Sequence, residues 1–497
     1  MMTYHLTYDF GSGSVKAALS NREFELCGIE NAPYPTYFPR FGQAEQKPEE
    51  HWSAMCQATR KLLKKTGVNP ADIAGIAIAQ TATTIIFTDV DGSPLIDCVM
   101  WMDGRAEEQA EKINERLQEK RFSGKNVIAK LLWFLENQPD IVERAYAMLD
   151  VSAFLFHRMT GEWVYEFTGS RATCLVDVGR RCWDEDMFEL IGFPRRLVPD
   201  RIAGSTEQIG LLTQNAAADL GLVPGIPLFG GCSDHATAML GTGCIRPGDA
   251  HIYMGTSAWL AAATSEDDPL PGRMPSPVPG LRYHFYDTDS GGSCIDYLLN
   301  TFYTDEMKRG ADVYTLMNQE VQTALEEEDE NVLFLPFLAG ASAPISNTTV
   351  RASLLNLTRS TKRRHIALAV MQGVCFNLRW MRDIHRERNG WNPNFLRGIG
   401  GGMASEVFAQ MLADVLDTPF TPLENPRFAG NLGLQSCIEV GLGQARDFTV
   451  LDDVVTCSKT YAPRRGYQKR HDRMYECYRE SYRSLEDMYR KLNETNR

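Results

Sequence analysis

The sequence lacks the features that mark several large classes of protein. Its 12 cysteines are scattered and never form C-x-x-C, which argues against a structural zinc site and a disulfide scaffold. The nine histidines show no H-E-x-x-H spacing, so nothing points to a catalytic transition metal. No apolar run approaches the roughly 20 residues of a membrane span, and the opening MMTYHLTYDF has no signal-peptide pattern. We therefore expect a cytoplasmic protein without a membrane partner.

Positive charge is also in short supply. The formal net charge is −13, which argues against a nucleic-acid partner because a phosphate backbone would be repelled. The chain has 497 residues, of which 43% are hydrophobic and 23% charged. These values are typical of a soluble globular enzyme with two or three domains.

The first unusual stretch is DFGSGSVKAAL, Asp9 to Leu19, in which small residues lie between an acid and a lysine. Small residues let backbone N–H groups approach an anion closely. Neither the P-loop spacing nor the dinucleotide fingerprint fits, because Val15 and Lys16 stand where a glycine is required. YHLTYD and SVKAAL alternate like strands. The pattern predicts a β-hairpin with a Gly/Ser tip, for which an ordinary tight turn is the alternative interpretation.

A similar pattern occurs near the middle of the chain. DAHIYMGTSAWLAAA reads as a strand, a Gly-Thr-Ser turn and a second strand. Each hairpin would begin its own half, and no period of 20–50 residues is visible, which indicates duplication at the scale of a domain. Hydrophobic periodicity also predicts helices over about 48–67, 361–388 and 467–492.

Further segments together carry a family resemblance. In chain order they are DFGSGSVKAAL, GQAEQKPEEHW, VMWMDGRAEEQA, KLLWFLENQPDIVERA, GGCSDHATAMLGTG, YMGTSAW, GIGGGMASEVFAQMLADVL and AGNLGLQSCIEVGLG. In this order the chain resembles a carbohydrate kinase of the FGGY family, closest in pattern to the xylulokinase branch, over about residues 4–445. The resemblance implies an α/β protein with a duplicated actin-like ATPase (ribonuclease H-like) fold, in two domains around a deep cleft. We expect an N-terminal domain over 1–245, a C-terminal domain over 246–460 and a C-terminal helix over 461–497.

Phosphoryl transfer requires an attacking hydroxyl, a metal on the phosphates and donors for the phosphoryl oxygens. Asp234 follows a strand and two glycines, where an acid could accept the proton of a sugar hydroxyl. The resemblance gives Asp234 the role of general base, and a helix N-cap is its alternative interpretation. The resemblance also implies that Asp9 is catalytic and orients Mg²⁺.

The resemblance further implies which residues bind ATP and the sugar. The residues that would contact ATP are Gly11, Ser12, Gly13 and Lys16 in the first hairpin, Gly255, Thr256 and Ser257 in the second, and Gly291, Gly292, Gly400, Gly401 and Gly402 at the adenosine end. The residues that would contact the sugar are Gln80, Thr81, Ala82, Trp101, Asp103, Arg105 and Asp234.

Several positions depart from the family pattern. Thr81 and Ala82 replace two residues that touch substrate in the family, and GASAP, Gly340 to Pro344, lacks the usual charges. Gln372 stands where a Glu is expected, and NPRFAGN replaces an acid near the last core helix. These departures put the sugar in question, and to a lesser degree full catalytic competence.

The sequence therefore predicts ATP-dependent phosphorylation of a terminal hydroxyl of a small sugar, with the ketopentose D-xylulose as the best single choice. Because Thr81 and Ala82 carry no charge, we expect glycerol and gluconate to be poor acceptors. The alternatives are a kinase of another ketose or polyol (ribulose, a pentitol, erythritol or gluconate) and a catalytically weak regulatory relative. WMDGR and PEEHW argue against an actin- or chaperone-like ATPase. The sequence leaves open whether the chain forms a homodimer.

Overall fold

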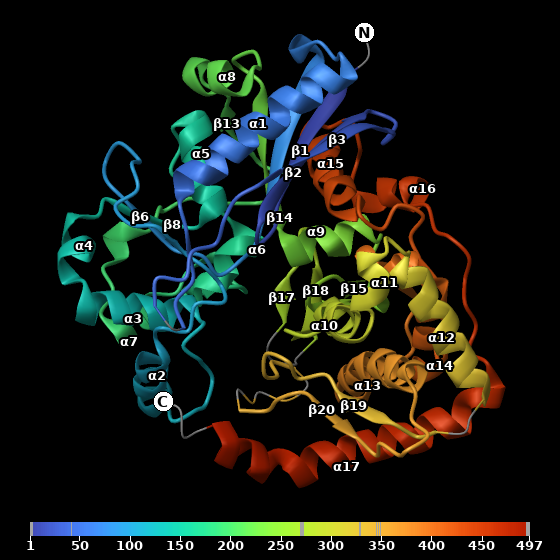
Figure 1. The fold of residues 1–497 in the computed structure, drawn as a ribbon. Helices are drawn as coiled ribbons and strands as arrows, with labels where there is room; N and C mark the ends of the chain where they lie inside the picture. Colours follow the sequence, from blue (N-terminus) through green and yellow to red (C-terminus); the bar gives the residue numbers. More distant parts are fainter. Residues whose placement is uncertain are drawn as a thin grey trace. The chain divides into compact units, whose positions relative to one another are not determined.

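The computed structural model describes residues 3–40, 42–268, 273–327, 330–343, 345, 347 and 349–493 (Figure 1). By the contacts between its residues, the chain divides into two compact units. Unit 1 comprises Met1–Gly243, Met274–Leu281 and Phe428–Val454, and unit 2 comprises Cys244–Arg273, Arg282–Arg427 and Val455–Arg497. The domain limits at 245 and 460 stay predictions of the sequence.

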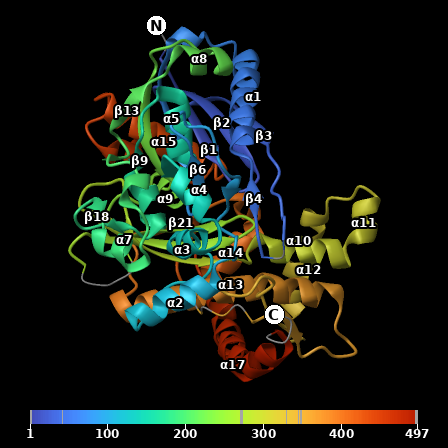
Figure 2. The same cartoon turned by 90° about the vertical axis from the view of Figure 1, so that its left-hand side faces the viewer.

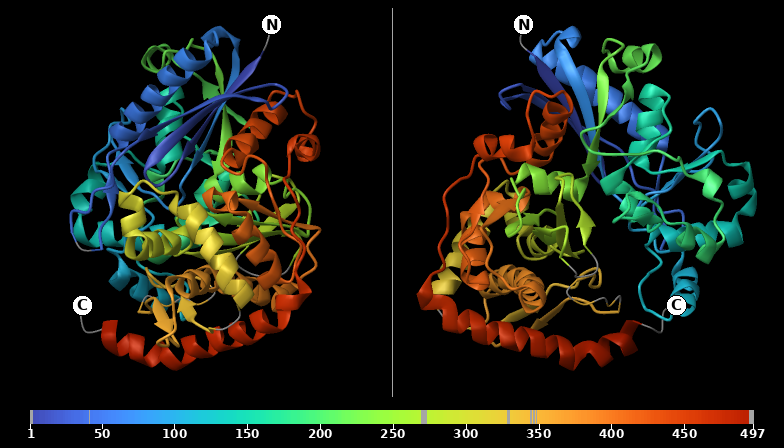
Figure 3. Two further views of the ribbon diagram at one scale, coloured as in Figure 1. Left: turned by 45° about the vertical axis from the view of Figure 1, so that its right-hand side comes forward. Right: turned by 180° about the vertical axis from the view of Figure 1, so that it is seen from behind.

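Unit 1 is built on a mixed sheet with the strand order β13-β14-β5-β1-β2-β3. Its strands are β1 (Tyr4–Phe10), β2 (Ser14–Asn21), β3 (Leu26–Pro33), β5 (Ile73–Gln80), β13 (Gln208–Leu211) and β14 (Pro227–Ser233). β1 and β2 form the predicted antiparallel hairpin, while β5 runs parallel to β1 and β14 runs parallel to β5. Figure 3 shows these strands, coloured blue to green, side by side. The carboxyl ends of β1, β5 and β14 therefore share one edge.

Helices cover this sheet because its strands are apolar. β5 has the sequence IAGIAIAQ, a nearly continuous buried run typical of a parallel strand covered on both faces. α15 (Ala429–Gly441) packs on β1, β5 and β14, and α1 (Pro48–Thr66) packs on β2 and β3 (Figure 2). α1 begins with Pro48 and ends before Gly67, whose φ of 68° gives the left-handed C-cap that the sequence predicts.

Unit 2 repeats the strand plan of unit 1. Its strands run in the order β18-β16-β15-β21-β22. Their bounds are β15 (Asp249–Met254), β16 (Ala258–Ser265), β18 (Leu281–Thr288), β21 (Phe395–Ile399) and β22 (Thr421–Pro422). β15 and β16 form the second predicted hairpin, and β21 runs parallel to β15, as β5 does to β1. The predicted duplication and the α/β fold are confirmed.

Two long helices organise the rest of unit 2. α13 (Arg363–Asn389) and α17 (Gln468–Asn493) lie close to the predicted ranges, and α17 packs on α13 and on β19 (Leu333–Leu335) (Figure 1). Four tyrosines of α17 are buried in this contact region, namely Tyr475, Tyr478, Tyr482 and Tyr489. The C-terminal helix is therefore a packed part of the core.

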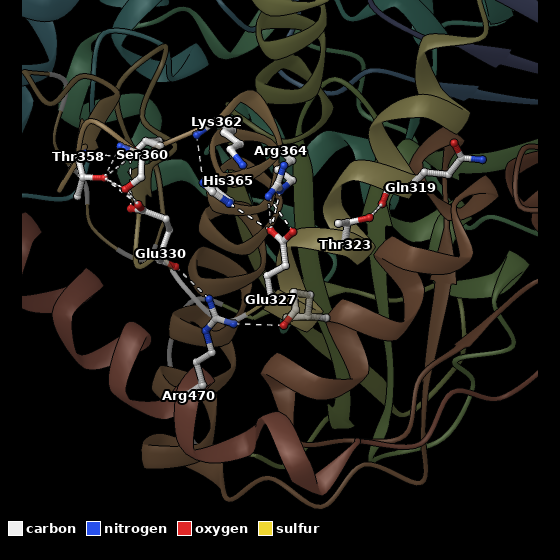
Figure 4. Close-up of polar contacts among 12 residues, drawn as sticks. Gln319, Thr323, Glu327, Glu330, Thr358, Ser360, Lys362, Arg364, His365 and Arg470 are labelled. Atoms are coloured by element: carbon white, nitrogen blue, oxygen red, sulfur yellow. Dashed lines mark hydrogen bonds and ion pairs between the residues drawn. The ribbon is translucent and has the colours of Figure 1, made fainter.

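Polar contacts fix the start of α13 (Figure 4). Glu330 accepts hydrogen bonds from the hydroxyls of Thr358 (2.7 Å) and Ser360 (2.5 Å), and its backbone carbonyl accepts one from Arg470 of α17 at 3.0 Å. Glu327 at the end of α12 (Val313–Glu327) accepts two 2.7 Å bonds from Arg364. These contacts tie α12, α13 and α17 together.

The remaining helices and strands are shorter or lie between these elements. The helices are α2 (Glu107–Leu117), α3 (Val127–Asn137), α4 (Pro139–Arg144), α5 (Val151–Thr160), α6 (Phe167–Ser170), α7 (Glu185–Ile191), α8 (Gln214–Leu220), α9 (Asp234–Gly241), α10 (Gly292–Phe302), α11 (Thr304–Lys308), α14 (Glu406–Leu416) and α16 (Leu451–Val454). The strands are β4 (Glu45–Gln46), β6 (Ile86–Thr88), β7 (Cys98–Val99), β8 (Ala147–Leu149), β9 (Tyr165–Glu166), β10 (Val176–Asp177), β11 (Cys182–Trp183), β12 (Ile202–Ala203), β17 (Met274–Pro275) and β20 (Ser353–Leu355). Within the described residues, no helix has both the length and the apolar character needed to cross a bilayer.

Candidate active site

Three parallel strands of unit 1 bring predicted site residues to one edge of its sheet. Phe10 of β1 and Ser233 of β14 both lie opposite Gln80 of β5. Asp9 is therefore one residue before this level and Asp234 one residue after it. Thr81 follows Gln80 directly, and its backbone N–H donates to the Phe10 carbonyl at 2.9 Å. The fold gathers two carboxylates and a hydroxyl that lie far apart in the sequence.

Asp9 and Lys16 face each other across the first hairpin. They are directly paired positions on β1 and β2, and the Lys16 Nζ donates to Asp9 Oδ2 at 3.1 Å. The side chains are 24% exposed for Asp9 and 32% for Lys16. A partly exposed ion pair of this kind stabilises a fold by at most about 1 kcal/mol. Because both side chains are partly exposed, both charges remain accessible to a ligand.

The tip of this hairpin is held by side chains from other elements. The Tyr34 hydroxyl donates to the Gly11 carbonyl at 2.6 Å, and Gln46 Nε2 donates to the Ser12 carbonyl at 2.7 Å. Trp101 Nε1 donates to Ser12 Oγ at 3.1 Å. Tyr34 and Gln46 thus engage carbonyl oxygens that would repel a phosphate, and all three donors set the position of the tip.

Asp234 is the first residue of α9, and Ser233 occupies the N-cap position. The Asp234 Oδ1 accepts the N–H of His235 at 2.9 Å, which is not a cap bond. The N-cap interpretation of Asp234 is therefore wrong. Its side chain is 27% exposed, so the carboxylate can be reached from solvent.

The surroundings of Asp234 favour proton uptake. Burial raises the pKa of the Asp234 carboxyl above its usual range, His235 opposes this rise, and the negative charge of Asp9 adds to it. A general base works best when its pKa lies near the working pH, so the rise suits that role. The influence of Asp9 also means that the two carboxylates lie within electrostatic reach of each other.

The residues around the end of β5 differ in what they offer a substrate. Gln80 is buried, and its Oε1 accepts the N–H of Ser152 at 2.7 Å. The Thr81 hydroxyl donates to the Phe10 carbonyl at 3.0 Å, which leaves its oxygen lone pairs as acceptors. Ala82 is buried and apolar. The residues at the end of β5 therefore present one hydroxyl oxygen and no charge of their own.

The WMDGR loop combines a partly exposed ring with a buried ion pair. Asp103 is fully buried, and its oxygens accept the N–H of Ala44 at 2.7 Å and the Arg105 guanidinium at 2.8 and 2.9 Å. Arg105 also donates to Glu45 at 2.5 Å. Asp103 and Arg105 thus bind protein groups beneath the loop, and Trp101 is the member that reaches the hairpin tip.

The tip of the unit 2 hairpin is enclosed by backbone. The Gly292 N–H donates to the Gly255 carbonyl at 2.7 Å, and the Gly291 N–H donates to the Thr256 carbonyl at 3.0 Å. A Cβ at Gly291 would lie 2.6 Å from the Ser257 carbonyl oxygen, so only glycine fits this position. The structure brings these five predicted residues into direct contact.

A cavity of about 580 Å³ lies beside this tip within unit 2. Gly401 and Gly402 line it, and Gly400 precedes them with a φ of 95°, in the left-handed region that favours glycine. Asn318 and Ser405 also line it, and the Ser405 hydroxyl donates to Asn318 Oδ1 at 2.9 Å. The other lining residues are Met254, Gly255, Thr256, Gly292, Ile295, Asp296, Tyr314, Thr315, Met317, Met371, Ala404, Phe408 and Arg427. Mostly apolar walls with a few polar groups are typical of a small-ligand site.

The described residues can be compared with what ATP and Mg²⁺ need. The glycines of unit 2 give close backbone approach, which suits phosphates and ribose. No group of three or more His, Cys, Asp or Glu that could hold a metal occurs in the described part of the chain. Mg²⁺ in kinases is usually bound by one or two carboxylates together with substrate phosphates. The accessible carboxylate of Asp9 fits that pattern.

The departures from the family pattern have distinct structural settings. Gln372 is buried, and its Nε2 lies 3.4 Å from His471 Nδ1, so it packs toward α17. In GASAP, the Ser342 hydroxyl donates to Asp289 at 2.8 Å, while Pro344 lies outside the described residues. In NPRFAGN, Gly430 faces Asp9, since a Cβ there would lie 3.3 Å from Asp9 Oδ2.

The sequence reasoning missed several residues beside the predicted site. Lys125 Nζ lies 5.9 Å from the centroid of the Trp101 ring, although no motif marked it. Asn318 lines the cavity from α12, where helical periodicity gives no sign of a ligand contact. Gln46 lies in the family segment GQAEQKPEEHW, whose resemblance predicts no role for it.

Comparison with known proteins also divides the chain into two parts, between residues 241 and 250. Residues 4–241 match the model of the FGGY family of carbohydrate kinases, N-terminal domain, and residues 250–436 match that of the C-terminal domain. A xylulose kinase of Lactococcus lactis is 26% identical over 514 residues, covering 100% of this chain and 99% of that protein. A gluconokinase of Bacillus subtilis is 26% identical over 521 residues, covering 99% and 98%. The crystal structure of ligand-bound xylulose kinase from Lactobacillus acidophilus has a TM-score of 0.89 at 20% identity, covering 99% and 100%.

Proposed function

The chain belongs to the FGGY family of carbohydrate kinases and is an ATP-dependent sugar kinase, and on that premise we propose that it phosphorylates a terminal hydroxyl of a neutral ketopentose, with D-xylulose as the first choice. The observation that carries the proposal is the convergence of Asp9, Thr81 and Asp234 at one edge of the unit 1 sheet. Two carboxylates and an uncharged acceptor oxygen suit a neutral polyol, and Thr81 and Ala82 supply no positive charge for an anionic sugar.

In the proposed reaction, Asp234 accepts the proton of the attacking sugar hydroxyl, helped by its raised pKa. Asp9 would bind Mg²⁺, and Lys16 would hold a phosphate oxygen once a ligand competes for its ion pair. ATP supplies the transferred phosphoryl group, and Mg²⁺ neutralises charge on the phosphates. The unit 2 cavity binds the nucleoside end, with Gly292, Gly401 and Gly402 allowing close approach.

Thr81 and Ala82 underlie the choice of a neutral acceptor. An uncharged hydroxyl and a methyl group make a pocket that selects by shape and by hydrogen bonds. The xylulose kinase among the relatives covers the whole chain, which agrees with this choice of substrate class. Glycerol is expected to be poor because it offers few hydroxyls to such a pocket.

A sugar acid is the second candidate acceptor, and Lys125 favours it. The Lys125 ammonium lies 5.9 Å from the Trp101 ring, on the predicted sugar side of unit 1, and could pair with a carboxylate. The gluconokinase relative also covers nearly the whole chain. Thr81 and Ala82 supply no positive charge, so Lys125 is the residue that would let the protein accept gluconate.

A coupled ADP-release assay separates the candidates. Turnover is measured on xylulose, ribulose, pentitols, erythritol, glycerol and gluconate at matched concentrations, with the wild type and with Lys125→Met. The ketopentose proposal expects the highest kcat/KM on xylulose, unchanged within about threefold in Lys125→Met. A preference for gluconate that falls at least tenfold in Lys125→Met establishes the second candidate. ATP binding without turnover on any acceptor indicates a regulatory relative and contradicts both.

A further inference from the structure

One segment of unit 1 contacts both candidate ligand-binding loops without belonging to either. It comprises the two-residue strand β4, Glu45–Gln46, and the first turns of α1, which contain His51. Gln46 and His51 are each only 1% exposed. Buried polar side chains cost free energy unless they are hydrogen-bonded.

Gln46 uses both ends of its amide group. Its Nε2 donates to the Ser12 carbonyl at 2.7 Å and to Thr36 Oγ1 at 2.8 Å. Its Oε1 lies 2.7 Å from His51 Nε2. Since both amide protons are engaged by Ser12 and Thr36, the remaining bond must be one that Gln46 Oε1 accepts.

His51 must therefore be the donor in that bond. Burial lowers the pKa of His51 to about 4, so the ring is neutral at pH 7 and carries a single N–H. The network assigns this proton to Nε2, because Gln46 Oε1 can only accept. The His51 ring also packs edge-on against Tyr34 at 4.6 Å, whose hydroxyl holds the Gly11 carbonyl. His51 thus fixes which way the Gln46 amide points.

The residue beside Gln46 serves the other loop. Successive side chains of a strand point to opposite sides, and Glu45 accordingly accepts a 2.5 Å bond from Arg105 of WMDGR. β4 also pairs with β7, which precedes that loop, with Glu45 opposite Val99. Trp101 of the same loop also contacts the hairpin directly, since its Nε1 donates to Ser12 Oγ at 3.1 Å. The phosphate hairpin and the WMDGR loop are thereby attached to the same two-residue strand.

We propose that Gln46, oriented by the Nε2 proton of His51, is a positioning residue. It fixes the position of the Ser12 backbone and couples the β1–β2 hairpin to the WMDGR loop, the acceptor-side loop. This inference rests on the proposed function for its effect on turnover. It does not rest on that function for its effect on the hairpin itself, which can be measured separately.

The kinetic test uses the full chain and four variants. Gln46→Leu removes both ends of the amide, and we expect kcat to fall about 10- to 100-fold, the scale of a small misplacement of reacting groups. The KM for the acceptor should stay within about threefold. His51→Leu should cause a similar loss, whereas His51→Gln should retain most of kcat because a glutamine Nε2 can donate where the imidazole Nε2 did. The double variant Gln46→Leu/His51→Leu should be no slower than Gln46→Leu, since His51 acts through Gln46.

Thr59→Val is the matched control. Thr59 is also buried in α1 and hydrogen-bonds a strand residue, the Tyr8 hydroxyl at 2.6 Å, but among the described residues it makes no hydrogen bond to the hairpin tip. We expect a similar loss of melting temperature and an unchanged kcat. An equal kcat loss in the control, or fully additive losses in the double variant, would overturn the positioning role.

Amide hydrogen exchange gives a readout that does not depend on activity. In Gln46→Leu and His51→Leu, exchange over residues 10–14 should rise at least tenfold relative to wild type, while exchange over 255–257 should stay unchanged. His51→Gln and Thr59→Val should leave both segments unchanged. Unaltered exchange over 10–14 contradicts the inference. Altered exchange in a protein that phosphorylates none of the tested acceptors supports the inference and counts against the proposed function.

Discussion

The two hairpin tips of this protein share a topology and differ in chemistry. In unit 1 the tip follows Asp9 and precedes Lys16, a charged and partly exposed pair. In unit 2 the corresponding Gly-Thr-Ser tip has no charged residue, and backbone N–H groups of Gly291 and Gly292 close it. The same strand order thus carries charged side chains at the tip in unit 1 and backbone hydrogen bonds at the tip in unit 2.

Under the proposed function, this difference corresponds to different roles for the two tips. Charges that can exchange partners suit the metal and the phosphoryl oxygens, where charge changes during the reaction. A tight backbone cradle beside a mostly apolar cavity suits a nucleoside that binds and leaves unchanged. Substitutions at the two tips should therefore fail in different ways.

The largest effect is expected from Gly292→Ala. A Cβ there would strike the Gly255 carbonyl, which already accepts the Gly292 N–H, and neither backbone group can yield. We expect ATP affinity to fall at least 100-fold and the free energy of unfolding to fall by about 3 kcal/mol. Calorimetric titration with ATP and urea unfolding measure these two quantities.

Gly13→Ala is the counterpart at the unit 1 tip. A Cβ there would meet nothing within 4 Å, so the free energy of unfolding should change by less than about 1 kcal/mol. Equal destabilisation by the two substitutions would remove the structural contrast between the tips.

Lys16→Met tests the charged tip. Loss of the ammonium should lower kcat about 10- to 100-fold, because a donor to developing phosphoryl charge is removed. The affinity for ATP should change much less, since the unit 2 cavity is intact. Steady-state kinetics at saturating Mg²⁺ measure both, and a kcat equal to that of wild type would remove Lys16 from the chemistry.

Lys130→Met tests the pKa of a buried lysine that contacts Met100, the residue before the WMDGR loop of unit 1. Lys130 is fully buried, donates to the Met100 carbonyl at 2.7 Å, and burial lowers its pKa to about 7. Between about pH 7 and 10.5 the unfolded chain binds a proton that the folded chain does not, so this lysine makes stability rise with pH. We expect the melting temperature of wild type to rise relative to Lys130→Met from pH 7 to pH 10. A constant difference over that range would contradict the lowered pKa.

The smallest effect concerns the loops after the central parallel strands. Thr83, after β5, has a φ of 66°, whereas unit 2 places Gly400, with a φ of 95°, after β21. Left-handed backbone costs a β-branched residue roughly 1–2 kcal/mol, partly offset in a glycine variant by the entropy of its unfolded chain. Thr83→Gly should therefore raise the free energy of unfolding by about 0.5 kcal/mol in urea titrations. A loss of stability would mean that contacts of the Thr83 side chain outweigh the strain.

Much of the fold was accessible from the sequence because its signals are local. The buried run of β5, the proline and glycine that bound α1, and the small residues at both hairpin tips each identify an element without tertiary information. The similarity of the two hairpins indicates the duplication, and the order of the family segments indicates the family. The N-cap interpretation of Asp234 is wrong by one residue, because Ser233 is the N-cap, and local sequence patterns do not resolve a difference of one residue.

The site was harder to predict because its details depend on contacts between distant segments. Asp103 and Arg105 have the residue types of sugar ligands, but the fold turns them toward Ala44 and Glu45. Lys125 lies near Trp101 only after two loops have folded together. Neither periodicity nor spacing in the sequence indicates such tertiary contacts. The sequence therefore predicts which loops form the site but not the contacts of every side chain within them.

The central claim is that unit 1 performs the chemistry through Asp234, and the Asp234→Asn variant tests it most directly. The substitution is isosteric at a partly exposed position and should leave the melting temperature and ATP affinity close to those of wild type. Single-turnover phosphorylation of the best acceptor, with saturating ATP and Mg²⁺, should slow at least about 100-fold, the scale of a general base. A rate within a few-fold of wild type would contradict the account.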